Sequence, residues 1–181
     1  MQTHPVRVVK VGGSLFDLPD LRGRLEGWLQ RQPPATNFLI AGGGALADSI
    51  RQLDQLHGIG NTSSHLLCVR AMGVTARLLV DVLTDTALID DLQTARTLIA
   101  QRPTRSAVFD AAPLLLAGER ELPPEPLPQE WTVTSDSIAA RVAEALGAQE
   151  LVLLKSESTP SESLDELAAA GDVDEVFPTI A

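Results

Sequence analysis

Residues 6–14 read Val6-Arg7-Val8-Val9-Lys10-Val11-Gly12-Gly13-Ser14, a run of β-branched residues that ends in two glycines. Such a run predicts a buried strand that passes into a glycine turn. A second run of this kind, residues 37–41, ends in Gly42-Gly43-Gly44. Between the two, residues 18–32 carry apolar side chains every three or four positions, which indicates an amphipathic helix. A strand–helix–strand unit favours a parallel sheet covered by helices.

The same pattern continues along the chain. We expect further helices over residues 45–56, 63–83, 92–102, 135–146 and 163–170, and further strands over 106–110 and a buried 151–155. Gly147 directly follows one helix and predicts a left-handed C-cap. Four prolines mark residues 119–130 as an extended surface loop. The fold class predicted is α/β, a three-layer αβα sandwich with a mainly parallel central sheet, in a single domain over residues 1–181.

Composition and charge exclude several classes of function. The 181 residues include 14 Lys+Arg and 24 Asp+Glu, which gives a formal net charge of −10. With only four Phe, two Trp and no Tyr, the chain lacks both the cations and the aromatic residues of a nucleic-acid-binding protein. No stretch approaches the ~20 apolar residues that span a membrane, and the residues before the first strand lead us to expect no signal peptide. The single cysteine, Cys68, is expected to be a buried hydrophobic residue, so we expect a cytoplasmic protein.

Small or polar residues follow three of the predicted strands: Gly12-Gly13-Ser14, Gly42-Gly43-Gly44 and Lys155-Ser156. Ligands of open parallel sheets bind outside the carboxyl ends of the strands. Glycines let backbone N–H groups approach an anion closely, and a helix N-terminus adds a favourable dipole. The two glycine clusters are therefore candidate phosphate-binding turns. The alternative is that they are only tight turns between a strand and a helix.

The only two lysines of the chain, Lys10 and Lys155, fall at the carboxyl ends of predicted strands. A lysine within an apolar strand is costly unless it is paired or binds a ligand, and lysine suits phosphate groups. Since side chains alternate along a strand, Lys10 shares a face with Val6 and Val8. The alternative is a solvated lysine on an edge strand. Neither glycine cluster matches a Walker A loop or a dinucleotide-binding fingerprint.

Three segments together resemble the amino acid kinase family, which includes acetylglutamate, aspartate, uridylate and isopentenyl phosphate kinases. They are residues 8–15, with Lys10-Val11-Gly12-Gly13-Ser14; residues 38–45, with the triple glycine; and residues 134–148, in which Asp136 opens a helix. These segments occur in the order of the family and span most of the chain. The resemblance implies an ATP-dependent kinase in which Mg²⁺ is carried by the nucleotide and the protein supplies no metal ligands.

The resemblance also implies roles for individual residues. Lys10 would bridge the donor and acceptor phosphates, and Asp136 would organise the lysines around the reacting centre; alternatively, Asp136 is only a helix N-cap. Gly12, Gly13, Gly43 and Gly44 would offer N–H groups to phosphoryl oxygens. The candidate catalytic residues are Lys10, Asp136 and Lys155; the candidate phosphate- or nucleotide-binding residues are Gly12, Gly13, Ser14, Ser135 and Ser156; the candidate substrate-binding residues are Gly42, Gly43, Gly44 and Arg70.

The sequence departs from the family pattern after the last predicted strand. Lys155 stands where the family usually has an aspartate, and the chain ends at Ala181, so we expect a shortened C-terminal nucleotide-binding part. Either Lys155 substitutes for a second catalytic lysine of the family, or the nucleotide site is curtailed. Residues 65–72 and 173–178 resemble a short branch linked to methanofuran- and tetrahydromethanopterin-dependent one-carbon metabolism. That likeness implies a phosphate-bearing acceptor.

Two functions remain open from the sequence. The first is a kinase that acts on a small anionic metabolite, with a phosphate or carboxylate as the acceptor group. The second is a non-catalytic binding or regulatory protein that keeps the anion-binding half of a kinase fold. The family resemblance further implies a homodimer, and neither nucleic acid nor a membrane is expected as a partner.

Overall fold

The core of the molecule is a parallel sheet of five strands. The computed structural model describes residues 5–101, 105–118, 122, 126–157 and 163–181. Among these residues the strand order is β3 (Ala87–Ile89), β4 (Arg105–Phe109), β2 (Thr36–Ala41), β1 (Val6–Val11) and β5 (Glu150–Leu154). Every pair of neighbours is parallel, so all strands have their carboxyl ends at one edge of the sheet.

Helices connect the strands and cover both faces of the sheet. They are α1 (Leu21–Arg31), α2 (Gly44–His57), α3 (Asn61–Val82), α4 (Leu92–Gln101), α5 (Ser135–Leu146) and α6 (Leu164–Ala169). Two short 3₁₀ helices, Gly13–Asp17 and Phe177–Thr179, and a π-helical turn, Leu114–Gly118, complete the described elements. No helix in the described residues has the length and apolarity needed to cross a bilayer.

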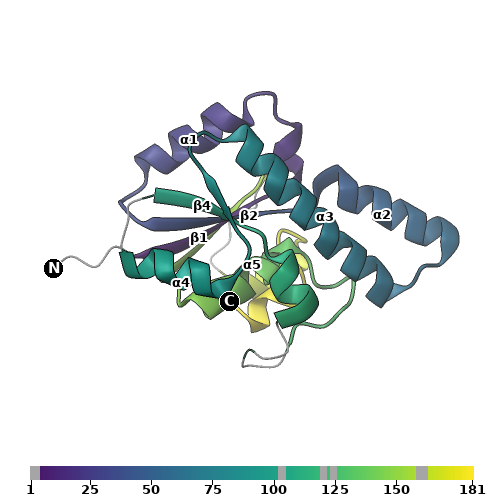
Figure 1. Cartoon of the computed structure of the whole chain (residues 1–181). Coiled ribbons are helices and arrows are strands. Elements are labelled where there is room, and N and C mark those ends of the chain that lie inside the picture. Colours follow the sequence, from purple (N-terminus) through teal and green to yellow (C-terminus); the bar gives the residue numbers. More distant parts are fainter. Residues whose placement is uncertain (1–4, 102–104, 119–121, 123–125, 158–162) are drawn as a thin grey trace.

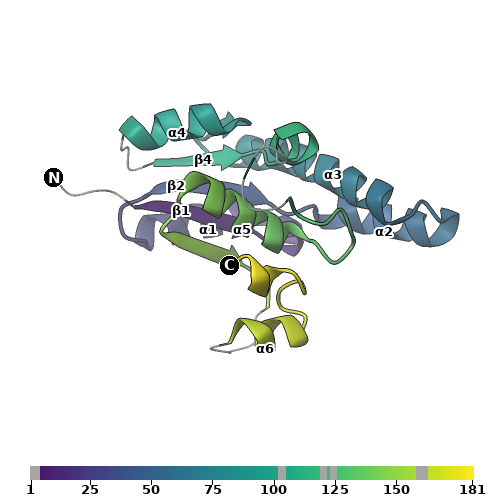
Figure 2. The same cartoon turned by 90° about the horizontal axis from the view of Figure 1, so that it is seen from below.

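Figure 1 shows the three layers, with α1 on one side of the sheet and α4 and α5 on the other. The alternation of side chains along β1 builds both interfaces: Val6 and Val8 belong to the apolar cluster beneath α4 and α5, while Val9 and Val11 belong to the cluster beneath α1. α2 and α3 form a hairpin that projects beyond the sheet at the carboxyl edge. The last elements, α6 and the 3₁₀ helix that follows, lie beside β5 (Figure 2).

This architecture confirms the α/β sandwich predicted from the sequence. Every predicted helix and strand is present within a few residues of its expected bounds, and Gly147 adopts the left-handed conformation (φ 62°, ψ 40°) that closes α5. The short strand β3 was not predicted, because three residues are too few to show a period. Residues 119–121 and 123–125 of the predicted proline loop lie outside the described residues.

One prediction about burial is wrong. The strand at 151–155 was expected to be buried, but β5 lies at the edge of the sheet and its last four residues are only half-buried. An edge strand pairs on one side only, and strand order cannot be deduced from the apolar run itself. Lys155, which follows β5, is therefore reachable from solvent.

Candidate active site

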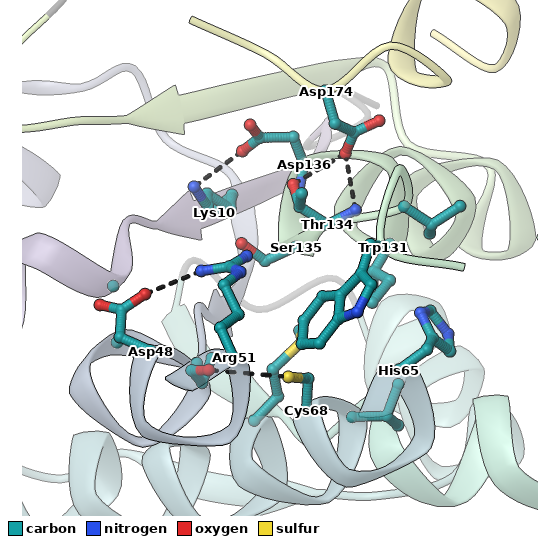
Figure 3. Close-up of a pocket in the computed structure, with 18 of the residues that line it drawn as sticks. Lys10, Asp48, Arg51, His65, Cys68, Trp131, Thr134, Ser135, Asp136 and Asp174 are labelled. Carbon is teal, nitrogen blue, oxygen red and sulfur yellow. Dashed lines mark hydrogen bonds and ion pairs between the residues drawn. The ribbon is translucent and has the colours of Figure 1, made fainter. Parts of the chain in front are cut away.

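A cavity of about 330 Å³ opens at the carboxyl edge of the sheet. It lies between the end of β1, the first turns of α2 and α5, and one face of α3 (Figure 3). Of the twelve sequence-predicted site residues, those that line it are Lys10, Gly13, Ser14, Gly43, Gly44, Ser135, Asp136 and Lys155. The parallel sheet therefore gathers residues that lie up to 145 positions apart, as expected for this edge.

Asp136 lies between the two lysines. Its Oδ1 is 2.7 Å from Lys10 Nζ, and its Oδ2 accepts a hydrogen bond of 2.8 Å from Lys155 Nζ. The side chains of Lys10 and Asp136 are 7% and 5% exposed, whereas that of Lys155 is 22% exposed. Two ammonium groups thus share one carboxylate, which leaves one positive charge of the trio without a partner inside it. A bound phosphate can pair with that charge, and Asp174 is a second negative charge near Lys10.

Burial lowers the pKa of Lys10 below its ordinary value of 10.5, even though the nearby carboxylate of Asp136 acts in the opposite direction. The nearby charge of Lys155 also lowers this pKa, and that of Asp174 raises it. Lys10 therefore lies in a setting where desolvation makes its charge costly and a bound anion would compensate the cost.

The two glycine turns are in direct contact with each other beside the cavity. A Cβ atom on Gly13 would come within 2.5 Å of the backbone nitrogen of Gly44, and Gly44 itself has a φ of +54°. Neither position accepts a side chain without displacement of the backbone. Gly43 is the N-cap of α2, and no side chain in the described part of the chain caps this helix. Gly43, Gly44 and Ala47 line the cavity, so the first turn of α2 borders it and is a candidate site for an anion.

Two of the predicted glycine roles need correction. The N–H of Gly12 donates to Leu154 O at 2.9 Å, and that of Gly42 donates to Val11 O at the same distance. These bonds hold the strand ends together, so neither N–H group is free for a phosphoryl oxygen, and neither glycine lines the cavity. Sequence alone could not separate them from Gly13, Gly43 and Gly44, because register across the sheet decides which N–H groups are used.

The predicted serines lie around the lysines. Ser14 and Ser135 line the cavity, and Ser156 lies outside it. The hydroxyls of Ser14 and Ser156 are 2.9 Å apart in a hydrogen bond that is open to solvent. This bond links the loop after β1 to the loop after β5, on the outer side of Lys155. Lys155 thus lies between the cavity, which it lines, and an exposed pair of hydroxyl groups.

Arg70 is not brought to this cavity. Its side chain is exposed, and Nη1 donates to Leu66 O within its own helix. The residues of α3 that do line the cavity are His65, Cys68, Val69 and Met72, which recur at helical spacing. Arg70 lies off that face.

The far wall of the cavity contains residues that sequence reasoning did not assign to the site. Trp131 lies over Arg51, whose guanidinium carbon is 5.4 Å from the centre of the indole ring. The indole N–H donates to Asp54 Oδ2 at 2.7 Å, which fixes the plane of the ring. Arg51 also pairs with Asp48 at 2.8 Å. Helical spacing from Gly44 could have indicated this face of α2, since Gly44, Ala47, Asp48 and Arg51 all line the cavity.

His65 and Cys68 complete this wall. His65 is buried, and its Nδ1 lies 3.1 Å from Glu130 O. Burial lowers the pKa of His65, so its neutral form is favoured. Cys68 was expected to belong to the core, but it is half-buried at the cavity wall, and burial raises the pKa of its thiol. The wall therefore combines the indole ring of Trp131 with His65, Cys68 and the ion pair of Arg51 and Asp48 (Figure 3).

Asp174 is a further residue that the sequence did not place in the site. It follows α6, and its carboxylate binds the first turn of α5, next to Asp136 (Figure 3). The cap of α5 is Thr134, whose hydroxyl accepts from Asp136 N at 3.3 Å. The alternative reading of Asp136 as the N-cap is therefore wrong, and its side chain is free to bind the lysines.

The described residues contain no group of three or more His, Cys, Asp or Glu side chains arranged to hold a metal ion. Acidic residues also lie at the N-termini of helices: Asp91 Oδ1 accepts from Thr94 N in the first turn of α4. Asp165 and Glu166 lie in the first turn of α6.

Comparison with known proteins supports the expected family. The chain is 25% identical to [5-(aminomethyl)furan-3-yl]methyl phosphate kinase from Methanocaldococcus jannaschii, over 97% of this chain and 82% of that protein. The chain matches no protein-family profile. The expected class of enzyme, a phosphotransferase, is that of this relative.

Solved structures establish the fold. The uridylate kinase of Archaeoglobus fulgidus superposes with a TM-score of 0.58 and 19% identity, over 89% of this chain and 69% of that one. The UMP kinase of Bacillus anthracis gives 0.59 and 12%, over 91% and 70%. The UMP kinase of Ureaplasma parvum gives 0.59 and 12%, over 97% and 83%. The chain has the fold of these kinases, and the resemblance seen in its sequence is confirmed.

Proposed function

Starting from the amino acid kinase fold of this chain, we propose that it is an ATP-dependent small-molecule kinase, which transfers the γ-phosphoryl group to a phosphate or carboxylate acceptor. The observation that carries the proposal is the carboxylate of Asp136 between Lys10 and Lys155, at the mouth of a cavity bordered by uncapped backbone N–H groups. Phosphoryl transfer needs positioning and charge compensation rather than covalent chemistry, and this arrangement supplies both.

The step itself is a direct displacement. An acceptor oxygen forms a bond to the γ-phosphorus, the bond from that phosphorus to the β,γ-bridging oxygen breaks, and ADP leaves with the electron pair. Negative charge moves onto the bridging oxygen as the bond breaks. In this proposal Lys10 lies between the two substrates and stabilises that charge, while Asp136 fixes both ammonium groups in place.

The acceptor occupies the cavity in this proposal, on the side of the trio that faces α2 and α3. The first turn of α2 and Lys10 would bind its anionic group, and Trp131, His65 and Met72 would contact its body. The M. jannaschii relative acts on a phosphate ester attached to a furan ring, and its name supports a phosphate-bearing acceptor with a flat body for this chain. A place in methanofuran- or tetrahydromethanopterin-linked one-carbon metabolism follows as part of the same proposal.

The nucleotide would approach from the exposed side. Lys155, Ser14 and Ser156 lie there, and the lysine charge and hydroxyl groups suit phosphate oxygens. When bound with the nucleotide, Mg²⁺ neutralises charge on the β- and γ-phosphates.

A homodimer in the cytoplasm completes the proposal. Seven of the nine large apolar side chains exposed in the described residues lie on the α2–α3 hairpin, where they would be covered by a second copy: Leu46, Leu53, Leu56, Ile59, Leu67, Val74 and Leu78.

A nucleotide-binding assay followed by a turnover assay tests the proposed reaction. Thermal unfolding is measured with ATP, ADP and Mg²⁺, and phosphorylated small molecules are then screened as acceptors with radiolabelled ATP. We expect nucleotide to raise the melting temperature and at least one phosphate ester to receive label, with no label in Lys10→Met. Stabilisation by a phosphorylated metabolite but by no nucleotide would instead identify a non-catalytic binding protein.

A fluorescence titration tests the placement of the acceptor. The chain has two tryptophans, and of these Trp131 lines the cavity whereas Trp28 lies on α1. In a Trp28→Phe variant, binding of an acceptor should change the emission of Trp131. An acceptor that is turned over without changing this emission would place its body elsewhere.

A further inference from the structure

We propose that Asp174 is a positioning residue for the proposed reaction, which holds Asp136 in line with Lys10 through the hydroxyl of Thr134. The kinetic part of this inference rests on the proposed kinase function, and its structural part does not.

The carboxylate of Asp174 joins two turns of backbone. Oδ2 accepts from Thr134 N at 2.9 Å, from Thr134 Oγ1 at 2.8 Å and from Ser137 N at 3.1 Å. Oδ1 accepts from Ser137 Oγ, from Val176 N at 3.2 Å and from Phe177 N at 3.0 Å. These bonds lower the pKa of Asp174 although burial acts in the opposite direction, so the carboxylate is ionised at neutral pH.

The hydroxyl group of Thr134 links Asp174 to the backbone of Asp136 by two hydrogen bonds. A hydroxyl group has one proton to donate, and that of Thr134 is directed at Asp174. Its lone pairs are then available to the N–H of Asp136, which lies 3.3 Å away. The backbone of Asp136 is thus fixed by the hydroxyl of Thr134, while its side chain holds Lys10. Without Asp174 the hydroxyl could rotate, and the first turn of α5 would lose its cap.

The place of Asp174 is itself fixed by packing away from the site. The neighbouring side chains Val173 and Phe177 are buried against Ala140 on the outer surface of α5. This contact docks the segment after α6 onto α5, beside β5 (Figure 2). The packing of its neighbours therefore fixes the position of Asp174. The first turn of α5, which carries Asp136, is anchored to Asp174 by hydrogen bonds.

The charges around Lys10 come from three segments. Asp136 faces it from α5, Lys155 from the loop after β5, and Asp174 from the segment after α6. Asp48 and Arg51 of α2 line the same cavity but pair with each other. A change in the position of Asp136 should therefore alter how readily Lys10 keeps its proton.

Lysine NMR can measure this directly, because Lys10 and Lys155 are the only lysines of the chain. Protein labelled with ¹⁵N- and ¹³C-lysine gives two side-chain signals, assigned with Lys155→Arg. In Thr134→Val, which keeps the charge of Asp174 but removes the hydroxyl, we expect Lys10 to deprotonate at lower pH than in wild type. Asp174→Asn should shift it further, since it also removes a negative charge. Thr134→Ser, which retains the hydroxyl, should titrate like wild type.

Glu175→Gln is the matched control, since Glu175 is exposed, adjoins Asp174 and carries the same charge. It should leave the Lys10 titration unchanged. A Lys10 titration that is unaltered in Thr134→Val would overturn the proposal, even if that variant were less stable, because a purely structural cap would lower the melting temperature alone.

Kinetics supply a second, distinguishable readout. We expect Asp174→Asn and Thr134→Val each to lower kcat by about tenfold, with KM for the acceptor within about twofold, as for other residues that orient a reacting group. The double variant should lose little more than either single one, since both act on the same turn. Wild-type protein that turns over no acceptor would contradict the proposed function, while the NMR result would still decide the role of Asp174. Full additivity in kcat would overturn the connection through Thr134.

Discussion

At the scale of single residues, the trio of Lys10, Asp136 and Lys155 combines burial with an unbalanced charge. Two buried ammonium groups without a carboxylate would repel each other, and a buried carboxylate with one lysine would attract no anion. The arrangement keeps one positive charge available at little cost in stability, because Lys155 reaches solvent. The free energy that a bound phosphate gains there is available for stabilising the transition state.

Replacement of Lys10 separates its catalytic from its structural contribution. Lys10→Met removes the charge but fills a similar volume, and Asp136 keeps its bond to Lys155. We expect kcat to fall by roughly 10²- to 10³-fold, the usual loss when one charge-stabilising donor is removed. Circular dichroism should show a folded protein. Arg22→Met, which removes an exposed cation of α1, is the control and should keep full activity; equal losses in both variants would contradict a specific role for Lys10.

The pH dependence follows from the direction of the Lys10 shift. Its pKa lies below 10.5 in the folded protein because burial disfavours the charged form. Activity that needs the ammonium group should therefore decline with rising pH at a value below 10.5. We expect kcat/KM of the wild type, which reports the pKa values of the free enzyme, to show this alkaline limb; a kcat/KM that stays constant up to pH 10.5 would contradict it.

The same shift has a thermodynamic consequence of known sign. A group that holds its proton less tightly when folded makes the free energy of unfolding rise with pH between its folded and unfolded pKa values. The stability of wild type relative to Lys10→Met should therefore increase as pH approaches 10.5. Chemical denaturation at several alkaline pH values measures this difference, and a relative loss of stability over that range would show that the pKa is not lowered.

At the scale of elements, the two glycine turns act as one unit. β1 and β2 are neighbours, so their following turns meet, and Gly13 lies against Gly44 with no room for a Cβ atom. The absence of side chains brings the uncapped first turn of α2 next to Lys10. Under the proposed function, the close contact of the two turns also keeps the first turn of α2 in place to bind an anion.

A methyl group at Gly13 tests this contact. Gly13→Ala should force the two turns apart, lower the free energy of unfolding by about 1–3 kcal/mol and reduce turnover. The matched control is Gly27→Ala in α1, where the added Cβ meets only a flexible arginine at 3.4 Å. That variant should be more stable by about 0.5–1 kcal/mol, because alanine favours a helix. Denaturant unfolding and turnover assays measure both, and a neutral Gly13→Ala would refute the close contact.

At the scale of the whole molecule, the sheet and its two helical layers bury most apolar residues, but the α2–α3 hairpin does not follow this rule. It projects from the sheet (Figure 1) with exposed leucines on both helices. Leu56 is 74% exposed, which is unusual for a large aliphatic side chain near others of its kind. The same hairpin forms a wall of the cavity, so an interface there would also stiffen the acceptor side of the site.

Negative charges introduced into the exposed apolar surface of the α2–α3 hairpin should dissociate the proposed dimer. In light scattering we expect the wild-type mass to be that of a dimer, and Leu53→Glu together with Val74→Glu to yield monomers. Leu164→Glu, on α6, is a matched control with similar exposure and should leave the mass unchanged. A wild type that is monomeric at micromolar concentration would contradict the proposed dimer.

Much of this structure could be predicted from local sequence. The β-branched runs, the helical spacing of leucines and the glycines at strand ends each specify their element through neighbours a few residues away. Lys10 could be placed on the face of Val6 and Val8 because side chains alternate along a strand, and it does face the α5 side of the sheet. The lysines could be singled out because a cation beside an apolar strand requires an explanation.

Contacts between distant segments were decided only by the tertiary structure. Asp136 pairs with the lysines, and Asp174 and Trp131 line the same cavity, because the fold brings segments that are distant in the chain to one edge of the sheet, whereas strand order and register leave no local pattern. In this register the N–H groups of Gly12 and Gly42 form hydrogen bonds between strand ends. Successive residues of α3 are rotated by about 100°, which directs Arg70 away from the cavity. The sequence thus determined which groups are present and in which elements, since those depend on local geometry. Packing determined which groups face one another, because burial and hydrogen bonding are satisfied across the whole fold.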